Sequence, residues 1–475
     1  MNTPHMTPAL AQTHRRALLW RIHFWAALIA SPFVVVACLT GLLYVFTPQI
    51  EQLRHGHLDQ VTPGERVQPL DASVAAARDA APEHWTLHSV IPAFDVRNSV
   101  RVVFVPPAVS KPTSAKPGNQ AGHGEHGAPV EHAAQNHLGH TTSAPGEAAP
   151  AFLRPNFGIP SRAMVIYVNP YTAEVLGQLR EAERFATWAR KLHSSLLQGD
   201  GWRWMIELAA SWTLVMLITG LQLWWPRKGQ RLMPQAGLKG RMAWRQWHAW
   251  VGMTLSLISL VILVTGLTWS QFAGSQVKWV RDATGQTPPR IPAHFKSTPS
   301  NQLEPLSWQQ ALVAIEREAP HVSMMIMPPK GPNGVWRANQ MDKGDPTKRF
   351  DLLLDAYRGK RLFYSGWSDQ TAFGMATAIG IPFHRGEFGL WNQGVLFLFG
   401  AGLLFSMISG WVMVFKRRGT SNALLPAVPW AAWRAIGPAA WLSALVMLVC
   451  MPLLALTAIP LAVVEAWRIR RGSPS

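Results

Sequence analysis

Apolar residues gather in runs of about twenty along this chain of 475 residues, and polar segments separate the runs. A helix rises about 1.5 Å per residue, so each run can cross the roughly 30 Å hydrocarbon core of a bilayer. The pattern therefore predicts an α-helical membrane bundle of at least four transmembrane helices. Pro452 and Pro460 break the last run, which forms either one tilted helix or a hairpin. The predicted transmembrane segments are 18–46, 204–225, 249–269, 391–415 and 439–466.

The two long polar segments, 47–203 and 270–390, show helix and strand signals in a similar order. Each has one stretch with helical periodicity, then strand-like runs, and finally a hairpin, so each predicts an α+β domain. Neither contains a nucleophile–base pair, a Gly-rich phosphate loop or a carboxylate cluster, so we expect no catalysis within them. The predicted helices are Asp71–Ala81 and Ser307–Glu318, and the strands are Ser99–Val105, Ala163–Val168, Glu174–Gly177, Val322–Met327, Arg349–Leu354 and Arg361–Tyr364.

The formal net charge of +18 is concentrated in short loops beside the apolar runs. Short basic loops stay in the cytoplasm, which predicts a multi-pass membrane protein with a cytoplasmic N-terminus. The charge is then a signal of topology, and we expect membrane lipid and no nucleic acid as a partner. The predicted cytoplasmic segments are 1–17, 226–248 and 416–438, with 467–475 as a C-terminal tail. Segments 47–203 and 270–390 then lie outside, which is the periplasm if the protein is bacterial. The first apolar run lacks a small-residue cleavage site, so we expect a retained helix rather than a removed signal peptide.

Both cysteines, Cys38 and Cys450, lie within apolar runs. The two α+β domains contain none, so we expect them to be stable without disulfides. Two cysteines are also too few for a Cys-ligated cluster.

Residues 107–150 interrupt the first α+β domain with a sequence rich in Pro, Gly, Ala and His. Such a composition cannot bury a core, so we expect a disordered insertion. The insertion either binds Cu(II), Ni(II) or Zn(II) loosely through imidazole or is a solvated polar segment that happens to contain histidine. Its candidate metal ligands are His123, His126, His132, His137 and His140.

Two histidines stand at matched places near the start of the first and third apolar runs. His23 and His248 are each followed by a Trp at an offset of two and a Thr-Gly-Leu at seventeen. His193 and His384 precede the second and fourth runs, with a glycine at offsets of twenty-seven and twenty-six. These offsets predict an internal duplication, in which helix, outer domain and helix occur twice. His23 and His248 then lie near the cytoplasmic side, and His193 and His384 near the periplasmic side.

A single histidine beside Trp and Arg at a membrane boundary is usually an interfacial anchor. Two facing pairs in matched places of a repeat favour another reading, because two neutral imidazoles can hold a haem iron from both faces. Cofactors in helical bundles are held by side chains of facing helices. We therefore predict His23, His248, His193 and His384 as haem axial ligands, and Arg21, Arg190, Arg245 and Arg385 as propionate partners.

The two H-x-W…T-G-L repeats, K-L-H-S-S-L-L-Q-G and the L-W-W-P-R exit after the second run resemble the PepSY-associated transmembrane family of iron-regulated inner-membrane proteins. The resemblance extends from about Arg15 to Arg471. It implies a multi-pass protein of the bacterial inner membrane with PepSY-like α+β domains in the periplasm, and some members bind haem and pass electrons to ferric siderophores. It carries the haem-ligand role onto the same four histidines. The insertion and the Ser409-Gly410 pair, in place of Thr-Gly, depart from the family pattern.

We expect a membrane oxidoreductase that binds two haem b groups and reduces periplasmic ferric-siderophore or related metal complexes. No GxGxxG follows a strand, so we expect neither an NAD nor a flavin site, and electrons come from a quinol or a separate reductase. One alternative is a haem-free PepSY scaffold that binds periplasmic peptides or proteins. The other is a metal-handling protein that uses the histidine-rich insertion.

Overall fold

The computed structural model describes residues 8–107, 158–225, 232–299, 302–417, 428, 432–433 and 436–471. The five candidate metal ligands of the insertion lie outside these residues. The chain divides into two compact units. The helical unit contains Met1–Phe46, Ala189–Gln286 and Ile379–Ser475, and the sheet unit contains Thr47–Trp188 and Thr287–Ala378.

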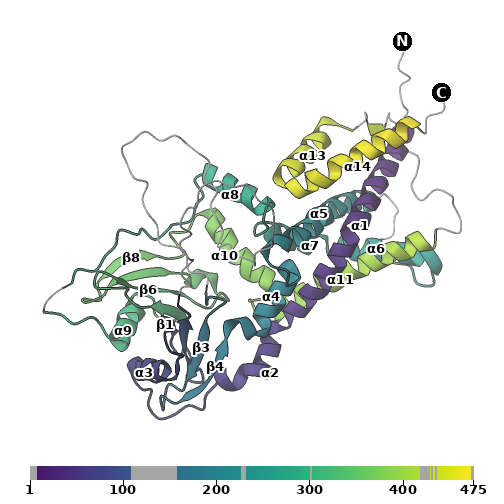
Figure 1. Ribbon diagram of the computed structural model, residues 1–475. Coiled ribbons are helices and arrows are strands. Elements are labelled where there is room, and N and C mark those ends of the chain that lie inside the picture. The colour runs from purple at the N-terminus through teal and green to yellow at the C-terminus, as the bar shows by residue number, and fades with distance from the viewer. Residues whose placement is uncertain are drawn as a thin grey trace, which may run out of the picture. The chain divides into compact units, whose positions relative to one another are not determined.

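Long apolar helices form the helical unit (Figure 1). Among the described residues, three helices are long and apolar enough to cross a membrane: Gln12–Val45 within α1, Asp200–Trp224 including α5, and α11. A fourth crossing exists if α6 and α7, which meet at an angle of 59°, form one broken span. The predicted segment 249–269 is thus a bent pair rather than one straight helix. The helix bounds are Pro8–Val45 for α1, Trp204–Trp224 for α5, Gly240–Thr254 for α6, Ser256–Leu267 for α7 and Leu390–Phe415 for α11.

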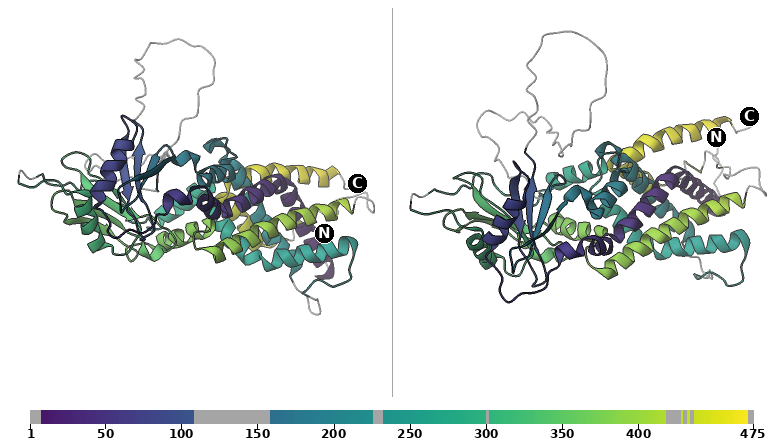
Figure 2. Two further views of the ribbon diagram at one scale, coloured as in Figure 1. Left: turned by 90° about the horizontal axis from the view of Figure 1, so that it is seen from below. Right: turned by 60° about the horizontal axis from the view of Figure 1, so that its bottom comes forward.

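Helix α1 lies at the centre of the contacts of this unit. It packs along both α5 and α11, and α11 in turn packs on α6 (Figures 1 and 2). Small residues on α1, Ala26 and Ala30, are fully buried and let the neighbouring helices approach closely. This arrangement brings the ends of helices from both halves of the chain side by side.

The last apolar region is two helices, α13 (Pro438–Cys450) and α14 (Pro452–Arg471), which contact each other. Polar contacts hold α14 against α1 and α5. The Glu465 carboxylate forms an ion pair with Arg21, at 2.5 Å, and accepts a hydrogen bond from Trp25 Nε1, at 2.9 Å. Trp212 Nε1 donates to Thr457 Oγ1, at 2.9 Å.

The sheet unit contains one antiparallel sheet of eight strands in the order β4-β3-β2-β1-β5-β6-β7-β8. The two predicted α+β domains therefore share one continuous sheet, because β1 pairs with β5 through Val90 and Ile326. Each predicted strand is found, and β1 and β6 are additional. The strand bounds are Thr86–Ile91 for β1, Val100–Val105 for β2, Met164–Val168 for β3, Val175–Arg180 for β4, Met324–Met327 for β5, Val335–Gln340 for β6, Asp351–Asp355 for β7 and Arg361–Ser365 for β8.

Helices α3 (Leu70–Ala80) and α9 (Trp308–Glu318) cover one face of this sheet and contact each other. The Asp71 carboxylate of α3 accepts hydrogen bonds from the backbone N–H groups of Trp308 and Gln309, at 2.9 and 3.0 Å. It therefore satisfies donors that the first turn of α9 leaves without helical partners. The remaining helices are α2 (Thr47–Asp59), α4 (Phe185–Ser195), α8 (Ala273–Ala283) and α10 (Ala372–Arg385), with short 3₁₀ helices at Glu181–Glu183, Asp200–Arg203 and Pro346–Lys348.

Candidate functional site

The four histidines singled out by their spacing all lie in the helical unit and form two pairs. His23 on α1 and His248 on α6 have ring centres 6.3 Å apart and ring planes at 88°. His193 stands near the end of α4 and His384 near the end of α10. Burial, reinforced by the nearby His384 imidazole, lowers the pKa of His193 to about 4, and burial also lowers the pKa of His384. Both imidazoles of the second pair are therefore neutral near pH 7.

Each imidazole reaches across to the hydroxyl of a neighbouring helix. The hydroxyls belong to the Thr-Gly or Ser-Gly pairs near the ends of the apolar runs. One histidine from another segment thus contacts each of the helices α1, α5, α7 and α11. The distances are 3.0 Å from His23 Nδ1 to Thr219 Oγ1, 3.0 Å from His193 Nδ1 to Thr40 Oγ1, 2.9 Å from His248 Nδ1 to Ser409 Oγ and 3.3 Å from His384 Nδ1 to Thr265 Oγ1.

These contacts determine which ring nitrogen carries the proton. A hydroxyl has one hydrogen, and Thr40, Thr219 and Thr265 each donate theirs to the carbonyl four residues earlier, at 2.7–2.8 Å. The hydroxyl oxygen must then accept from Nδ1–H. His248 Nδ1 and His384 Nδ1 also lie 3.1 Å from backbone carbonyls, which can only accept. Every Nδ1 is therefore the protonated nitrogen, and the lone pair is on Nε2.

The Nε2 atoms remain available for another ligand. Within the described part of the chain, Nε2 of each of the four histidines has no hydrogen-bond partner. A histidine that binds a metal ordinarily donates its other ring N–H to a protein oxygen, which fixes the tautomer and orients the ring. The four imidazoles have this arrangement.

Glycines let three of these rings lie directly against a helix backbone. A Cβ built on Gly41 or Gly220 would stand 3.2 Å from Cε1 of His193 or His23, and one on Gly266 only 3.0 Å from His384 Cε1. These contacts are closer than carbon atoms ordinarily approach. At Gly410 the matching distance to His248 Cε1 is 3.9 Å, an ordinary contact. Sequence reasoning gives these glycines no role, although the recurring T-G pair is the signal that marks them.

The spacing of His23 and His248 fits two ligands of one metal ion. Metal–imidazole bonds are about 2.0–2.1 Å long and a ring centre lies about 1.1 Å from its nitrogen, so two imidazoles whose nitrogens faced each other across one metal ion would have centres about 6.2–6.4 Å apart. The observed 6.3 Å falls in this interval. The donor set, two neutral imidazoles with a lone pair on Nε2, is one that holds haem iron.

The four arginines predicted as propionate partners differ in their surroundings. Arg21 is largely buried and paired with Glu465. Arg385 forms an ion pair with Glu387, at 2.9 Å, and its Nε donates to the Tyr44 hydroxyl, at 3.3 Å. The remaining two, Arg190 and Arg245, are exposed. The role of all four with propionates stays a prediction.

No group of three or more His, Cys, Asp or Glu side chains that could hold a metal ion occurs among the described residues. The imidazoles come together only as pairs.

Comparison with known proteins assigns the chain to a family. The family model of the PepSY-associated TM region matches residues 20–417. This match covers both histidine pairs and both halves of the sheet, and it ends before α13 and α14. No curated protein matches the chain. Together with the three or four apolar helices, the family match indicates a membrane protein. The chain therefore belongs to the family of PepSY-associated transmembrane proteins.

Proposed function

We propose that this protein is a haem-binding electron-transfer protein of the bacterial inner membrane that reduces ferric complexes in the periplasm. The observation that carries the proposal is the set of four imidazoles, in two pairs, with Nδ1–H bound to a protein oxygen and Nε2 without a partner. A set of interfacial anchors would need neither the fixed tautomer nor the glycines against which the rings lie.

The His23 and His248 pair would hold one haem b, and the His193 and His384 pair a second. When bound, haem b supplies a one-electron couple, and the protein contributes ligation, orientation and burial. Thr219 and Ser409 keep the first pair in the ligating tautomer, and Thr40 and Thr265 do the same for the second. Burial keeps His193 and His384 neutral, so neither ring must lose a proton to ligate.

The two sites lie at different depths along one helix. His23 belongs to α1, and Thr40, seventeen residues later on the same helix, holds His193. At about 1.5 Å per residue these positions are about 25 Å apart, close to the thickness of a bilayer core. The basic loops would place the His23 and His248 pair on the cytoplasmic side and the other pair on the periplasmic side. Electrons would then pass through the two sites in series.

The chemistry of iron supports a ferric complex as the acceptor. Hard oxygen donors hold Fe(II) less tightly than Fe(III), so one-electron reduction loosens the chelate. We interpret the two halves of the sheet as duplicated PepSY-like domains. They would meet this substrate in the periplasm. A quinol or a separate reductase would supply the electrons.

The test removes each histidine in turn. We expect a reduced-minus-oxidised spectrum of the purified wild-type protein to show low-spin haem. His23→Ala or His248→Ala should remove the low-spin signal of one site, and His193→Ala or His384→Ala that of the other. Ferric reduction across reconstituted vesicles should fail in all four variants.

His57→Ala, a histidine of α2 outside both pairs, is the matched control and should leave both signals intact. A colourless wild-type protein would contradict the proposal and favour the haem-free scaffold. A complete low-spin spectrum in all four variants would show that these histidines are anchors.

A further inference from the structure

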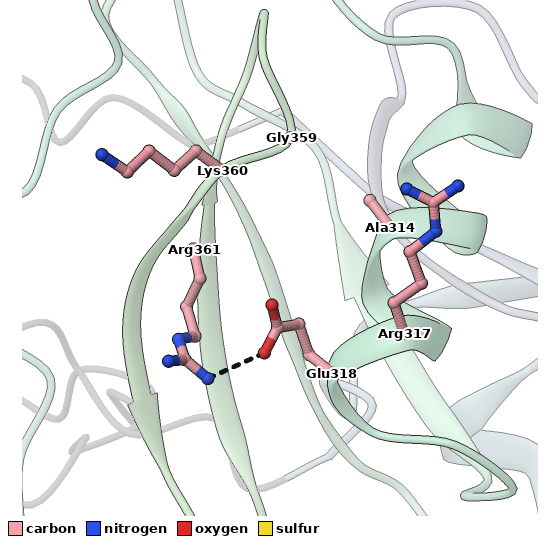
Figure 3. A pocket seen from close by; sticks show the side chains of 6 residues that line it. All are labelled: Ala314, Arg317, Glu318, Gly359, Lys360 and Arg361. Carbon is pink, nitrogen blue, oxygen red and sulfur yellow. Dashed lines mark hydrogen bonds and ion pairs between the residues drawn. The ribbon is translucent and has the colours of Figure 1, made fainter.

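A basic pocket lies in the sheet unit, between the last turns of α9 and the turn that joins β7 to β8 (Figure 3). Its volume is about 420 Å³, which is in the range of sites for small molecules. We call it the α9–β8 pocket. Its lining residues are Ala314, Arg317, Glu318, Gly359, Lys360 and Arg361.

The pocket has an excess of positive charge. Three of its side chains are cationic and one, Glu318, is anionic, which leaves a net charge of +2. Arg361 forms an ion pair with Glu318, at 2.9 Å. Figure 3 shows the Glu318 carboxylate facing Arg361 of β8, the Arg317 guanidinium on the side of α9 beside Ala314, and Lys360 extending from the turn away from α9. Among the described residues, Arg317 and Lys360 have no carboxylate partner.

The fold does not require this charge. The first half of the sheet has the same order of elements, with α3 in the place of α9 and the β3–β4 turn in the place of the β7–β8 turn. The penultimate residue is Asp79 in α3 and Arg317 in α9. Gly359 in the β7–β8 turn and Ala173 in the β3–β4 turn both have positive φ. Lys360 follows Gly359, whereas Glu174 follows Ala173. Acidic residues thus occupy the corresponding place in the first half.

We propose that the α9–β8 pocket binds a small polycarboxylate, either free or as its metal chelate. Guanidinium groups bind carboxylates through two parallel hydrogen bonds, and two of them flank this pocket. Without a ligand, Arg361 is paired with the Glu318 carboxylate. A carboxylate of the ligand that binds Arg361 therefore displaces Glu318. In naming polycarboxylate chelates as the substrate class, this inference rests on the proposed function.

Binding can be measured by calorimetry on the full-length protein in detergent, with citrate alone and with gallium(III) citrate, which does not undergo reduction here. We expect both probes to bind. Arg317→Glu with Lys360→Glu should weaken binding at least tenfold, and Arg317→Gln should weaken it less. Glu318→Gln should strengthen binding several-fold, because the ligand no longer competes with an internal carboxylate.

Arg78→Glu is the matched control, because Arg78 is an exposed arginine in the last turn of α3. It should leave the affinity for both probes unchanged. The inference is overturned if neither probe binds, if Glu318→Gln does not bind more tightly, or if Arg78→Glu weakens binding as much as the double variant.

The measurement does not depend on haem. A colourless protein that still binds citrate in this pattern would refute only the proposed electron transfer. A red protein that reduces ferric complexes and shows no binding would refute only the pocket.

Discussion

Replacing each of the four glycines beside the histidines by alanine should reduce the low-spin haem signal to a degree set by the distance between the new methyl group and the histidine ring. Alanine is favoured over glycine in a helix by about 1 kcal/mol. At Gly410 the new methyl group would lie 3.9 Å from His248 Cε1, so only this gain remains. We expect Gly410→Ala to be stabilising by about 0.5–1 kcal/mol and to leave the haem spectrum unchanged.

At Gly266 the methyl group would lie 3.0 Å from His384 Cε1, so the ring must move by several tenths of an ångström to reach an ordinary contact distance. The ring cannot retreat freely, because its Nδ1 is held by Thr265 and by the Ile262 carbonyl. Inserting a methyl group into a packed site costs about 1–3 kcal/mol, which exceeds or cancels the helix gain. Gly41→Ala and Gly220→Ala, at 3.2 Å, should fall between these extremes.

The assay is the visible spectrum together with thermal unfolding of each purified variant. We expect the loss of low-spin signal to be largest for Gly266→Ala, smaller for Gly41→Ala and Gly220→Ala, and absent for Gly410→Ala. The reasoning is refuted if Gly410→Ala perturbs its site as strongly as Gly266→Ala does, or if none of the four changes the spectrum.

Three further changes test other contacts. Thr219→Val removes the acceptor of His23 Nδ1–H and should weaken haem binding at that site by about tenfold or more in titrations, whereas Thr219→Ser should retain it. Glu465→Gln breaks the buried ion pair between Arg21 and Glu465 and should cost about 3 kcal/mol in thermal unfolding. A double variant with Leu at both positions should recover part of this loss, and a double variant less stable than the single one would contradict the expectation. Asp71→Ala removes the acceptor of the first N–H groups of α9 and should lower stability by about 1–2 kcal/mol by the same measurement, and no change would show that water replaces the carboxylate.

The histidines could be found from the sequence because their offsets repeat. Equal spacing from His23 and His248 to a Trp and a Thr predicts that both occupy the same place in a repeated unit, and the two rings do meet. What the spacing could not predict is the partner of each ring. Thr219 is 196 residues from His23, and only helix packing brings the two together.

Strands β1 and β6 were missed because polar residues interrupt their apolar patterns. Ser89 is fully buried in β1 and contacts His88 Nδ1, at 3.0 Å. Gln340 is buried at the end of β6, where its Nε2 donates to the Asp345 carbonyl, at 2.7 Å. A polar side chain with a local partner can be buried at little cost, and the hydrophobic pattern does not register this.

The bend between α6 and α7 also has no sequence marker of the usual kind. Kinks usually occur at proline or at glycine, and neither stands at Leu255 or Ser256, where the helix breaks. The Ser256 hydroxyl donates to the Met253 carbonyl, at 2.7 Å. A serine hydroxyl that binds a nearby carbonyl competes with the helical hydrogen bonds. Such a serine occurs both within continuous helices and at breaks, so it does not mark this bend. Sequence pattern alone therefore predicts one straight span here.

The pairing of β1 with β5 sets a delay in the biogenesis of the protein. Strands β1 to β4 are complete once Arg180 has been made, but β5 begins only at Met324, about 140 residues later. At roughly 5–20 residues per second, the β1 edge of every new chain stays open for about 7–30 s. An open strand edge can pair with any other strand that it meets. The time that the ribosome needs to make residues 181–323 therefore sets how long this strand edge waits for its partner.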